Sequence, residues 1–363
     1  MSTIAFDARL LNERGTTTAV FDFARGVERE LGHRAVVLHH TSDVSYDPVV
    51  VSQFEDCFET IAYAGPDDLK DKVQASGADV FYSFNIGPGK DRLVPGVKNV
   101  QHVLFQHYAP RGEVYAYISR WLSDHVTLGR EPWVPLIVDL PPPDRDLRDE
   151  WGFSSEATVL GRHGGYDQFD LAFVKGAIAA ALERREDLCF AFLNTQPFME
   201  HERVRFLPRV HGLIEKANFI AACDGLLHAR KAGEGFGLAV AEFLAFDKPV
   251  LCWAGGKDRN HLHMVPDNRF VYRTASDLLR LLLEFRPQPA NGYFRSAVEG
   301  YSPAAVMQRF REVFLDGPGQ VARWPRWPVQ ARFKLANRAI VLQGRLWRDQ
   351  GLRELRGLAA GSR

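Results

Sequence analysis

The sequence predicts an α/β protein with two doubly wound Rossmann-like domains facing a central cleft, followed by a basic helical segment. Three observations support this fold class. Short buried strands alternate with helical patterns over residues 3–106, a proline-rich break interrupts them at 138–151, and the alternation restarts at 157. Such alternation is typical of parallel sheets with helices on both faces. The expected domains are 1–138 on the acceptor side, 139–318 on the donor side, and a C-terminal segment 319–363.

In the first domain, apolar runs predict strands at 3–8, 35–40, 78–85 and 100–106. Residues 19–31 carry apolar side chains at helical spacing, which predicts a helix. Thr18 is its expected N-cap, and Gly32 follows its expected end.

A connector separates the two domains. The three consecutive prolines of "VDLPPPDRDLRDEW" (138–151) predict a stiff, extended segment. Beyond it, the pattern predicts strands at 157–163, 189–195, 225–230 and 249–254, and helices at 171–184, 212–223 and 237–246, the first capped by Asp170. Ligands bind at the carboxyl ends of strands in such sheets, so we expect the functional residues there.

The composition is that of an ordinary globular protein, with 46% hydrophobic and 25% charged residues. Charged residues near the N-terminus argue against a signal peptide, and no uncharged apolar run reaches the roughly 18–20 residues that span a bilayer. The cysteines are isolated in apolar contexts, which favours buried free thiols over disulfides or a metal site; they are Cys57, Cys189, Cys223 and Cys252. We therefore expect a cytoplasmic protein without a metal site.

The C-terminal segment is basic, although the whole chain has no net charge. From Gly319 onward, ten basic residues face two acidic ones, so the remainder of the chain is acidic. Three alternatives follow: packing against the first domain, peripheral contact of 319–363 with the inner face of a membrane, and, least favoured, nucleic-acid binding. The aromatic residues that would suit a membrane surface are Trp324, Trp327, Phe333 and Trp347.

The most informative stretch is "GEGFGLAVAEF" (233–243), where a glycine-rich loop leads from a strand into a helix. The amides and dipole of such a helix start favour an anion. Gly233, Gly235 and Gly237 do not form the GxGxxG pattern of dinucleotide sites, and no GK[ST] of a P-loop is present.

Two carboxylates accompany this anion site. Glu234 lies in the loop and Glu242 on the following helix, eight residues apart, so both can face the same cleft. A carboxylate repels phosphate but accepts hydrogen bonds from a vicinal diol. A ligand with a central diphosphate and a sugar at each end fits this pattern, and a nucleotide sugar is such a ligand.

The stretch "EGFGLAVAEFLAFDKPV" resembles the E-x7-E motif of retaining GT-B glycosyltransferases of the family 4 type. The resemblance implies that Glu234 holds hydroxyls of the transferred sugar and that Glu242 binds the ribose. It also implies that the amides of Phe236, Gly237 and Leu238 meet the diphosphate. "VLGRHGG" matches the family's strand that ends in Gly-Arg, so Arg162 is the candidate for neutralising the diphosphate.

One position departs from this family pattern. Members usually carry a lysine about five positions after that arginine, where this chain has Asp167. Arg230 or Lys231 could replace the missing cation, or the amides of Gly164 and Gly165 could do so.

In the first domain the resemblance points to the loop before the first helix and to a strand end. Gly15 and Thr16 are the expected contacts near the phosphate, and His102 is the expected histidine beside the donor sugar. The alternatives are structural: an ordinary tight turn for "GEGFG", a strand-end salt bridge for Arg162, and a core histidine bonded to the backbone for His102.

We therefore expect a glycosyltransferase that moves a hexose from a UDP- or GDP-linked sugar to a hydroxyl group of a glycan or glycolipid. The resemblance implies retention of configuration, no required metal and no cofactor besides the donor. The alternatives are a noncatalytic nucleotide-sugar-binding or scaffold protein and a GT-B sugar-nucleotide epimerase.

Overall fold

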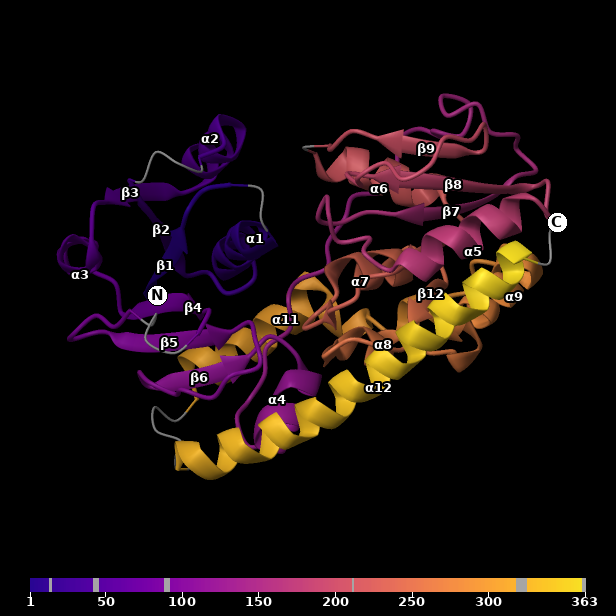
Figure 1. The fold of residues 1–363 in the computed structure, drawn as a ribbon. Helices are drawn as coiled ribbons and strands as arrows, with labels where there is room; N and C mark the ends of the chain where they lie inside the picture. The colour runs from indigo at the N-terminus through magenta and orange to yellow at the C-terminus, as the bar shows by residue number, and fades with distance from the viewer. Residues whose placement is uncertain (13–14, 42–45, 88–91, 211, 318–324, 361–363) are drawn as a thin grey trace. The chain divides into compact units, whose positions relative to one another are not determined.

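The computed structural model describes residues 1–12, 15–41, 46–87, 92–210, 212–317 and 325–360 (Figure 1). Contacts divide the chain into two compact units, Met1–Ile137 with Gly300–Lys334 and Val138–Glu299 with Leu335–Arg363. Each unit is built on a six-stranded sheet in which all paired strands are parallel. The prediction of two doubly wound α/β halves is thus confirmed.

The sheet of the first unit has the order β3-β2-β1-β4-β5-β6, which is the Rossmann order. Its strands are β1 (Thr3–Arg9), β2 (Arg34–His40), β3 (Glu59–Tyr63), β4 (Val80–Asn85), β5 (Lys98–Val103) and β6 (Val114–Tyr117). Alternate residues along β1 and β4 face opposite sides. Ala5 and Phe81 pack with Val36, Leu38 and Val73 in one buried cluster, whereas Phe6 and Tyr82 contact each other.

The helices of this unit are α1 (Gly15–Arg29), α2 (Pro48–Cys57), α3 (Pro66–Ala75), α4 (Arg120–Thr127) and α11 (Pro303–Phe310), with a short π-helix, η3, at Arg311–Leu315. Thr18 does not cap α1, because the helix begins three residues earlier, at Gly15. The sequence pattern missed α2, β3, α3, β6 and α4. α2 and α3 begin with proline and bury only two residues each, so their apolar periodicity is weak. α4 follows the polar cap Ser119 and buries five of its eight residues.

Residues 300–318 were expected in the donor domain, but Gly300–Lys334 belongs to the first unit. The reason is aromatic packing. The ring of Phe310 stacks on Tyr82 at 5.8 Å and lies 5.4 Å from Phe23, and Phe314 lies 5.7 Å from Tyr82. The chain thus returns to complete the core of the first unit.

The sheet of the second unit has the order β14-β12-β10-β7-β8-β9. Its strands are β7 (Thr158–Arg162), β8 (Leu188–Leu193), β9 (Val204–Leu207), β10 (Gly225–His228), β12 (Val250–Trp253) and β14 (Val271–Tyr272), and β11 (Gly233–Glu234) pairs separately with β13 (Asp258–Arg259). The helices are α5 (Ala172–Leu182), α6 (Leu213–Ala222), α7 (Leu238–Ala245), α8 (Asn260–Met264), α9 (Ala275–Glu284) and α10 (Tyr293–Ser296), with a 3-10 turn η1 (Asn268–Phe270). A second 3-10 turn, η2 (Glu299–Tyr301), lies where the chain passes from the second unit back to the first. Every strand and helix predicted for this unit is present within a few residues.

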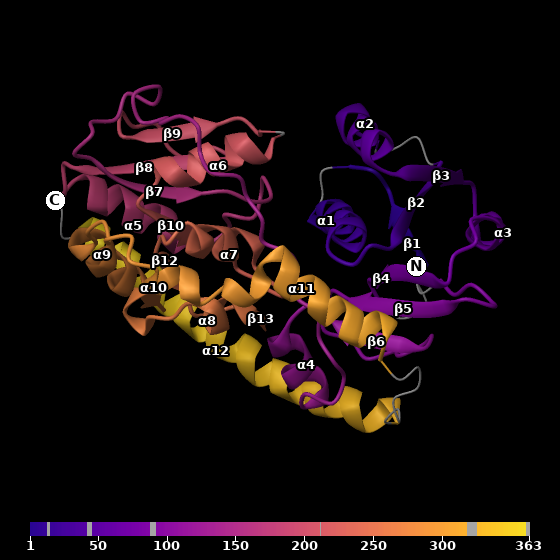
Figure 2. The same cartoon turned by 180° about the vertical axis from the view of Figure 1, so that it is seen from behind.

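The last helix, α12 (Arg326–Ala360), is drawn in orange to yellow and is partly hidden behind other helices in Figure 2, whereas Figure 1 shows it in front. In the first unit, Val329 and Phe333 are buried and Arg332 donates to the carbonyls of His125 and Val126. Within the second unit, Trp347 lies 5.9 Å from the guanidinium of Arg259.

This packing corrects the expected membrane aromatics. Phe333 and Trp347 are engaged inside the protein, Trp324 lies outside the described residues, and Trp327 is 79% exposed. No helix among those the structure describes has the length and apolar character to cross a bilayer. Cys57 is exposed, so the expectation of a buried thiol is wrong there; Cys189, Cys223 and Cys252 are buried free thiols.

Candidate functional site

The candidate donor residues other than Gly15, Thr16 and His102 belong to the second unit, and they lie near the ends of its strands. Arg162 is the last residue of β7, Arg230 follows β10, and the glycine-rich loop leads through β11 into α7. Parallel strands place their carboxyl ends at one edge of the sheet, where doubly wound proteins bind ligands.

Arg162 is 5% exposed and is held by neutral oxygens. Its Nη1 donates to the carbonyl of Asn194 at 3.1 Å and to Oγ1 of Thr195 at 2.6 Å, and its Nη2 donates to the carbonyl of Gly165 at 2.8 Å. Burial lowers the pKa of Arg162 to about 10, with the nearby Glu234 acting in the opposite direction. The guanidinium is therefore oriented by partners that do not neutralise its positive charge.

Gly164 and Gly165 form the loop around this guanidinium. Gly164 has a φ of +149°, and a Cβ there would lie 3.1 Å from Nη2 of Arg162. The side-chain Nδ2 of Asn194 donates to the Gly164 carbonyl at 2.8 Å. This hydrogen bond connects the loop to the residue that follows β8.

The glycines of 233–237 satisfy backbone requirements. Gly233 has a φ of +73°, and a Cβ there would lie 1.9 Å from the carbonyl oxygen of Asp258. Gly237 has a φ of +98° and occupies the N-cap position of α7, where no described side chain caps the helix. Gly235 lies between them, and Phe236 is buried, with its carbonyl accepting from Asn260 at 2.7 Å. The first amides of α7, from Leu238 onward, therefore lie at a helix start without a side-chain cap, where the sequence predicts an anion site.

Glu234 is held by two basic side chains. Nη1 of Arg230 donates to its Oε2 at 2.6 Å, and Nε2 of His228 lies 3.5 Å from Oε1. Burial alone would raise the pKa of Glu234, but His228, Arg230 and His261 lower it to about 2. The side chain is 21% exposed, so an ionised, partly accessible carboxylate is available to accept hydrogen bonds.

His261, at the start of α8, fixes the backbone of Glu234. Its Nδ1 accepts from the Glu234 amide at 3.2 Å, and its Nε2 donates to the Trp253 carbonyl at 3.1 Å. The side chain is 0% exposed, and burial lowers its pKa to about 3. A neutral imidazole therefore links the loop to the end of β12.

Glu242 faces inward from α7 and is 3% exposed. Nζ of Lys216 donates to its Oε1 at 2.6 Å, and Nε2 of His163 lies 3.1 Å from Oε2. Burial alone would raise the pKa of Glu242, but the effect of Lys216 and His163 is larger and lowers this pKa to about 2. Since His163 directly follows Arg162, the end of β7 supplies one of the two basic partners of Glu242.

Lys231 lies apart from this constellation. Its amide donates to Oδ1 of Asp170 at 2.6 Å, and its side chain is exposed. Asp170 therefore does not cap α5, whose N-cap is Leu171 without a side-chain cap.

In the first unit, the structure places Gly15 and Thr16 at the start of α1, after β1. His102 differs from its expected role. It is 0% exposed, its Nδ1 lies 2.6 Å from the Tyr82 hydroxyl, and its Nε2 lies 2.8 Å from the Val134 carbonyl. Both ring nitrogens thus have partners inside the core, and burial lowers the pKa to about 3. His102 is therefore a structural histidine, which is the alternative given for it from the sequence: a core histidine bonded to the backbone.

Sequence reasoning missed the partners of the two glutamates. Lys216 lies 26 residues before Glu242, and His261 lies 27 residues after Glu234, so no local spacing connects them. His163 and His228 lie at the ends of β7 and β10, and this position at a strand end is the local signal that could have indicated them.

Three buried residues below the loop could approach a metal ion: His228, Cys252 and His261, whose ligand atoms lie within 4.8 Å of one another. Both nitrogens of His261 already bond backbone groups. Metal binding by this set would require one of those two bonds to break.

Comparison with known proteins supports the fold. Neither a family model nor a curated protein matches the chain. HepE of Anabaena, solved with UDP and glucose, has a TM-score of 0.66 at 14% identity over 86% of this chain and 99% of its own. WaaG, a glycosyltransferase involved in lipopolysaccharide biosynthesis, has a TM-score of 0.57 at 15% identity over 86% of this chain and 100% of its own.

These likenesses define the class of the fold as GT-B, with glycosyltransferases as structural neighbours. A structure assigned as a UDP-N-acetylglucosamine 2-epimerase of Listeria monocytogenes has a TM-score of 0.55 at 9% identity, over 89% of this chain and 100% of its own. The fold therefore accommodates both chemistries, and the site must distinguish them.

Proposed function

We propose that the protein transfers a hexose from a UDP- or GDP-linked sugar to a hydroxyl group of a glycan or lipid-linked acceptor, with retention of configuration and without a metal. One observation carries the proposal. Two ionised glutamates, Glu234 and Glu242, flank an uncapped helix start beside a buried arginine, on the edge of the sheet where GT-B proteins carry ligands.

In the proposed mechanism the residues provide electrostatic stabilisation. Arg162 and the first amides of α7 stabilise the charge that develops on the leaving diphosphate. Glu234 accepts hydrogen bonds from the transferred sugar, with Arg230 and His228 keeping the carboxylate ionised and in place. Glu242 accepts from the ribose hydroxyls, because each carboxylate oxygen can accept a second hydrogen bond beside Lys216 or His163.

The two glutamates should fail differently when they are replaced. Glu234→Ala should abolish transfer and leave UDP affinity within about threefold, because in the proposed mechanism Glu234 contacts the transferred sugar and not the nucleotide. Glu242→Gln should weaken UDP binding at least tenfold. Calorimetric titration with UDP and a mass-spectrometric donor screen measure the two effects.

Glu200→Ala removes an exposed glutamate of the same unit and is the charge control. Glu242→Ala leaves Lys216 without a counter-ion and without an acceptor, and is expected to destabilise the unit by about 3–5 kcal/mol. Glutamine keeps an acceptor oxygen for Lys216, so the glutamine variant carries the test. Equal behaviour of the Glu234 and Glu242 variants would contradict the assigned roles.

Two other functions share this fold. A noncatalytic nucleotide-sugar-binding protein would bind UDP or GDP sugars without turnover in any acceptor screen. An epimerase, supported by the Listeria neighbour, would convert a UDP-sugar into its epimer without an acceptor. Product analysis by mass spectrometry and NMR separates the three, and no binding of any nucleotide sugar would exclude all of them.

We further propose that the protein works in the cytoplasm and contacts the inner face of an anionic membrane through α12. Leu335, Leu342 and Leu346 are 64%, 59% and 59% exposed, and their spacing places them on one helix face. Exposed Arg338 and Arg345 lie beside them. Leucines next to arginines suit an anionic lipid surface, whereas nucleic acid offers no contact for the leucines.

Sedimentation with vesicles tests this contact. The protein should bind vesicles containing phosphatidylglycerol and not pure phosphatidylcholine. Leu342→Gln with Leu346→Gln should reduce binding several-fold, whereas Phe105→Gln, at an exposed apolar residue elsewhere, should not. Equal binding by all variants would overturn the assignment of this face.

A further inference from the structure

A cavity of about 510 Å³ lies in the second unit, bounded by the loops after β7, β10 and β12 and by one side of α12. Among the described residues, its lining includes none of Arg162, Glu234 and Glu242. We call it the basic cavity, after the four cationic side chains that line it: Lys231, Lys257, Arg345 and Arg348.

These four cations face a single lining carboxylate, that of Asp170. Asp170 already accepts the Lys231 amide at 2.6 Å. Arg345 and Arg348 are three residues apart on α12 and therefore share a helix face. Like charges repel in a concave space, and such a space concentrates field lines that attract an anion. The arrangement is stabilised when a multiply charged anion enters.

The wall of the basic cavity carries a further hydrogen-bond donor. Trp253 lines it and is 2% exposed, and its indole Nε1 has no hydrogen-bond partner among the described residues. Buried donors without acceptors are rare in folded proteins and call for an explanation. The lining thus has an excess of donors and positive charge over acceptors.

Glycines allow the backbones that form the walls of the basic cavity to lie close together. A Cβ on Gly344 of α12 would lie 3.4 Å from the Gly256 amide, and one on Gly256 would lie 2.6 Å from the Gly233 amide. The helix, the loop after β12 and the loop that carries Glu234 therefore meet through backbone. Long cationic side chains, rather than wall side chains, shape the opening.

We propose that the basic cavity is a second anion site, which binds a ligand carrying phosphate groups separately from the donor diphosphate. The cavity volume is that of a small-molecule site, in the range of about 300–1,000 Å³. Arginine guanidinium groups bind phosphate oxygens in pairs, and lysines add point charges. The phosphate groups can belong to a phosphorylated acceptor or to a free phosphate or diphosphate.

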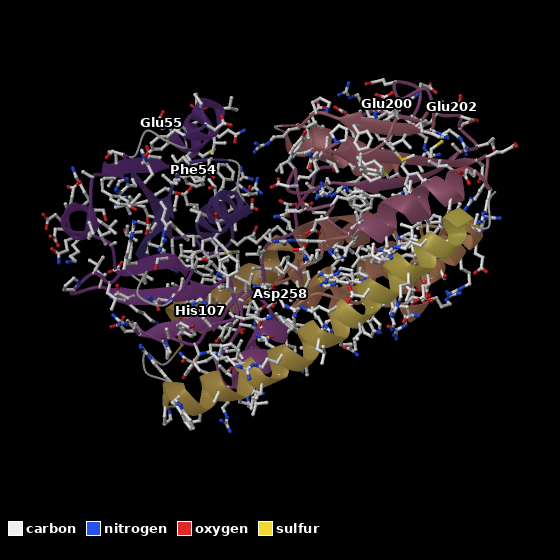
Figure 3. All side chains as sticks on the ribbon, viewed as in Figure 1. Phe54, Glu55, His107, Glu200, Glu202 and Asp258 are labelled. Atoms are coloured by element: carbon white, nitrogen blue, oxygen red, sulfur yellow. The ribbon has the colours of Figure 1, made fainter. Side chains whose placement is uncertain are left out.

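The basic cavity is connected to the proposed donor site. Lys257 directly precedes β13, whose Asp258 and Arg259 pair with Gly233 and Glu234 of β11. Asp258 is labelled in Figure 3. An anion that orders Lys257 therefore acts one residue from the strand that positions Glu234. This consequence rests on the proposed function, whereas the binding itself does not.

Calorimetric titration of inorganic pyrophosphate into protein saturated with UDP tests the site. The wild type should show one binding event beyond UDP, and Lys257→Ala with Arg345→Ala should weaken it at least tenfold. Arg338→Ala with Arg356→Ala removes the same charge from exposed positions of α12 outside the cavity and should stay within twofold. Absence of the additional event, or an equal loss in the control pair, would overturn the proposal.

A failure of the proposed donor site can be distinguished from a failure of the basic cavity. If UDP does not bind, pyrophosphate is titrated into the free protein, and the comparison between the two variant pairs still decides. The source of the phosphate is separated by kinetics. A phosphorylated acceptor predicts a raised acceptor KM in the Lys257 and Arg345 variant with an unchanged donor KM. A free ligand predicts that added phosphate changes the wild-type rate and not the variant rate.

Discussion

At the scale of single residues, Glu234 depends on groups that do not touch a ligand. Its carboxylate is held by Arg230 and its backbone amide by His261. The hydrogen bond from the Glu234 amide to His261 fixes the backbone from which the Glu234 side chain extends. His261 therefore acts as a positioning residue. Burial lowers the pKa of His261 and keeps the imidazole neutral. Nδ1 without a proton accepts from the Glu234 N–H, whereas a proton on Nδ1 would oppose this hydrogen bond.

Replacement of His261 should reduce kcat more than donor affinity. His261→Leu removes both ring hydrogen bonds and should lower kcat by roughly 10–100-fold, the range expected for misplacement of about 1 Å, with donor KM little changed. His261→Asn keeps an acceptor for the Glu234 amide and should recover much of the loss. Steady-state kinetics of the two variants provide the measurement. Equal losses would indicate a general structural role instead.

At the scale of elements, α12 is joined to the second unit by close contact at glycine. A Cβ on Gly351 would lie 3.0 Å from Cγ of Phe173 and 3.2 Å from the Ala275 amide. Glu354, one turn later, accepts from the Ser276 amide at 2.9 Å. The helix thus contacts both α5 and the start of α9, which its basic composition did not suggest.

Two alanine substitutions in α12 should have opposite effects. Gly351→Ala should destabilise the protein by about 1–3 kcal/mol, because a packed ring and a backbone amide leave little room. Gly357→Ala, with no atom within 4 Å of the added Cβ, should stabilise it by about 0.5–1 kcal/mol through helix propensity. Urea denaturation of the full chain measures both. The same sign for both variants would contradict this account of the packing.

At the scale of the whole molecule, buried ionisable groups in both units set the pH dependence of stability. His102 and His261 have pKa values lowered to about 3 in the folded chain. The unfolded chain binds these protons near pH 6.5, so the free energy of unfolding falls as the pH drops from about 6.5 towards 3. Glu234 and Glu242 are ionised down to about pH 2, so their stabilisation is lost from about pH 4.5 downward.

The unfolding free energy should therefore decline by up to about 1.4 kcal/mol per pH unit for each buried histidine below pH 6. His102→Gln should reduce this slope by up to about 1.4 kcal/mol per pH unit, which is the contribution of one proton. This change in slope is expected whatever the variant does to the unfolding free energy at pH 7.5. His263→Gln, at an exposed histidine, should leave the slope unchanged. Urea midpoints at pH 7.5, 6.0 and 5.0 provide the slopes. An unchanged slope in His102→Gln would show that His102 is not buried and neutral.

Sequence reasoning succeeded where a backbone requirement or a periodic pattern was local. The glycines of 233–237 indicated a loop before a helix, and the structure has this loop, with φ values of +73° and +98° at Gly233 and Gly237. It failed for His102, although His102 does lie next to Val103, the carboxyl end of β5. The side chain of His102 faces the aromatic core, and alternation along a strand cannot reveal which face of the sheet is covered.

The sequence by itself determined the two parallel α/β halves, the glycine loop and the spacing of Glu234 and Glu242, because these depend on short-range periodicity and on conformations open to glycine. Only the tertiary structure decided which cations balance those glutamates, that residues 300–334 complete the first unit, and that α12 lines a basic cavity in the second. Such contacts join residues tens to hundreds of positions apart. Their partners are selected by packing of whole elements, which leaves no local pattern in the chain.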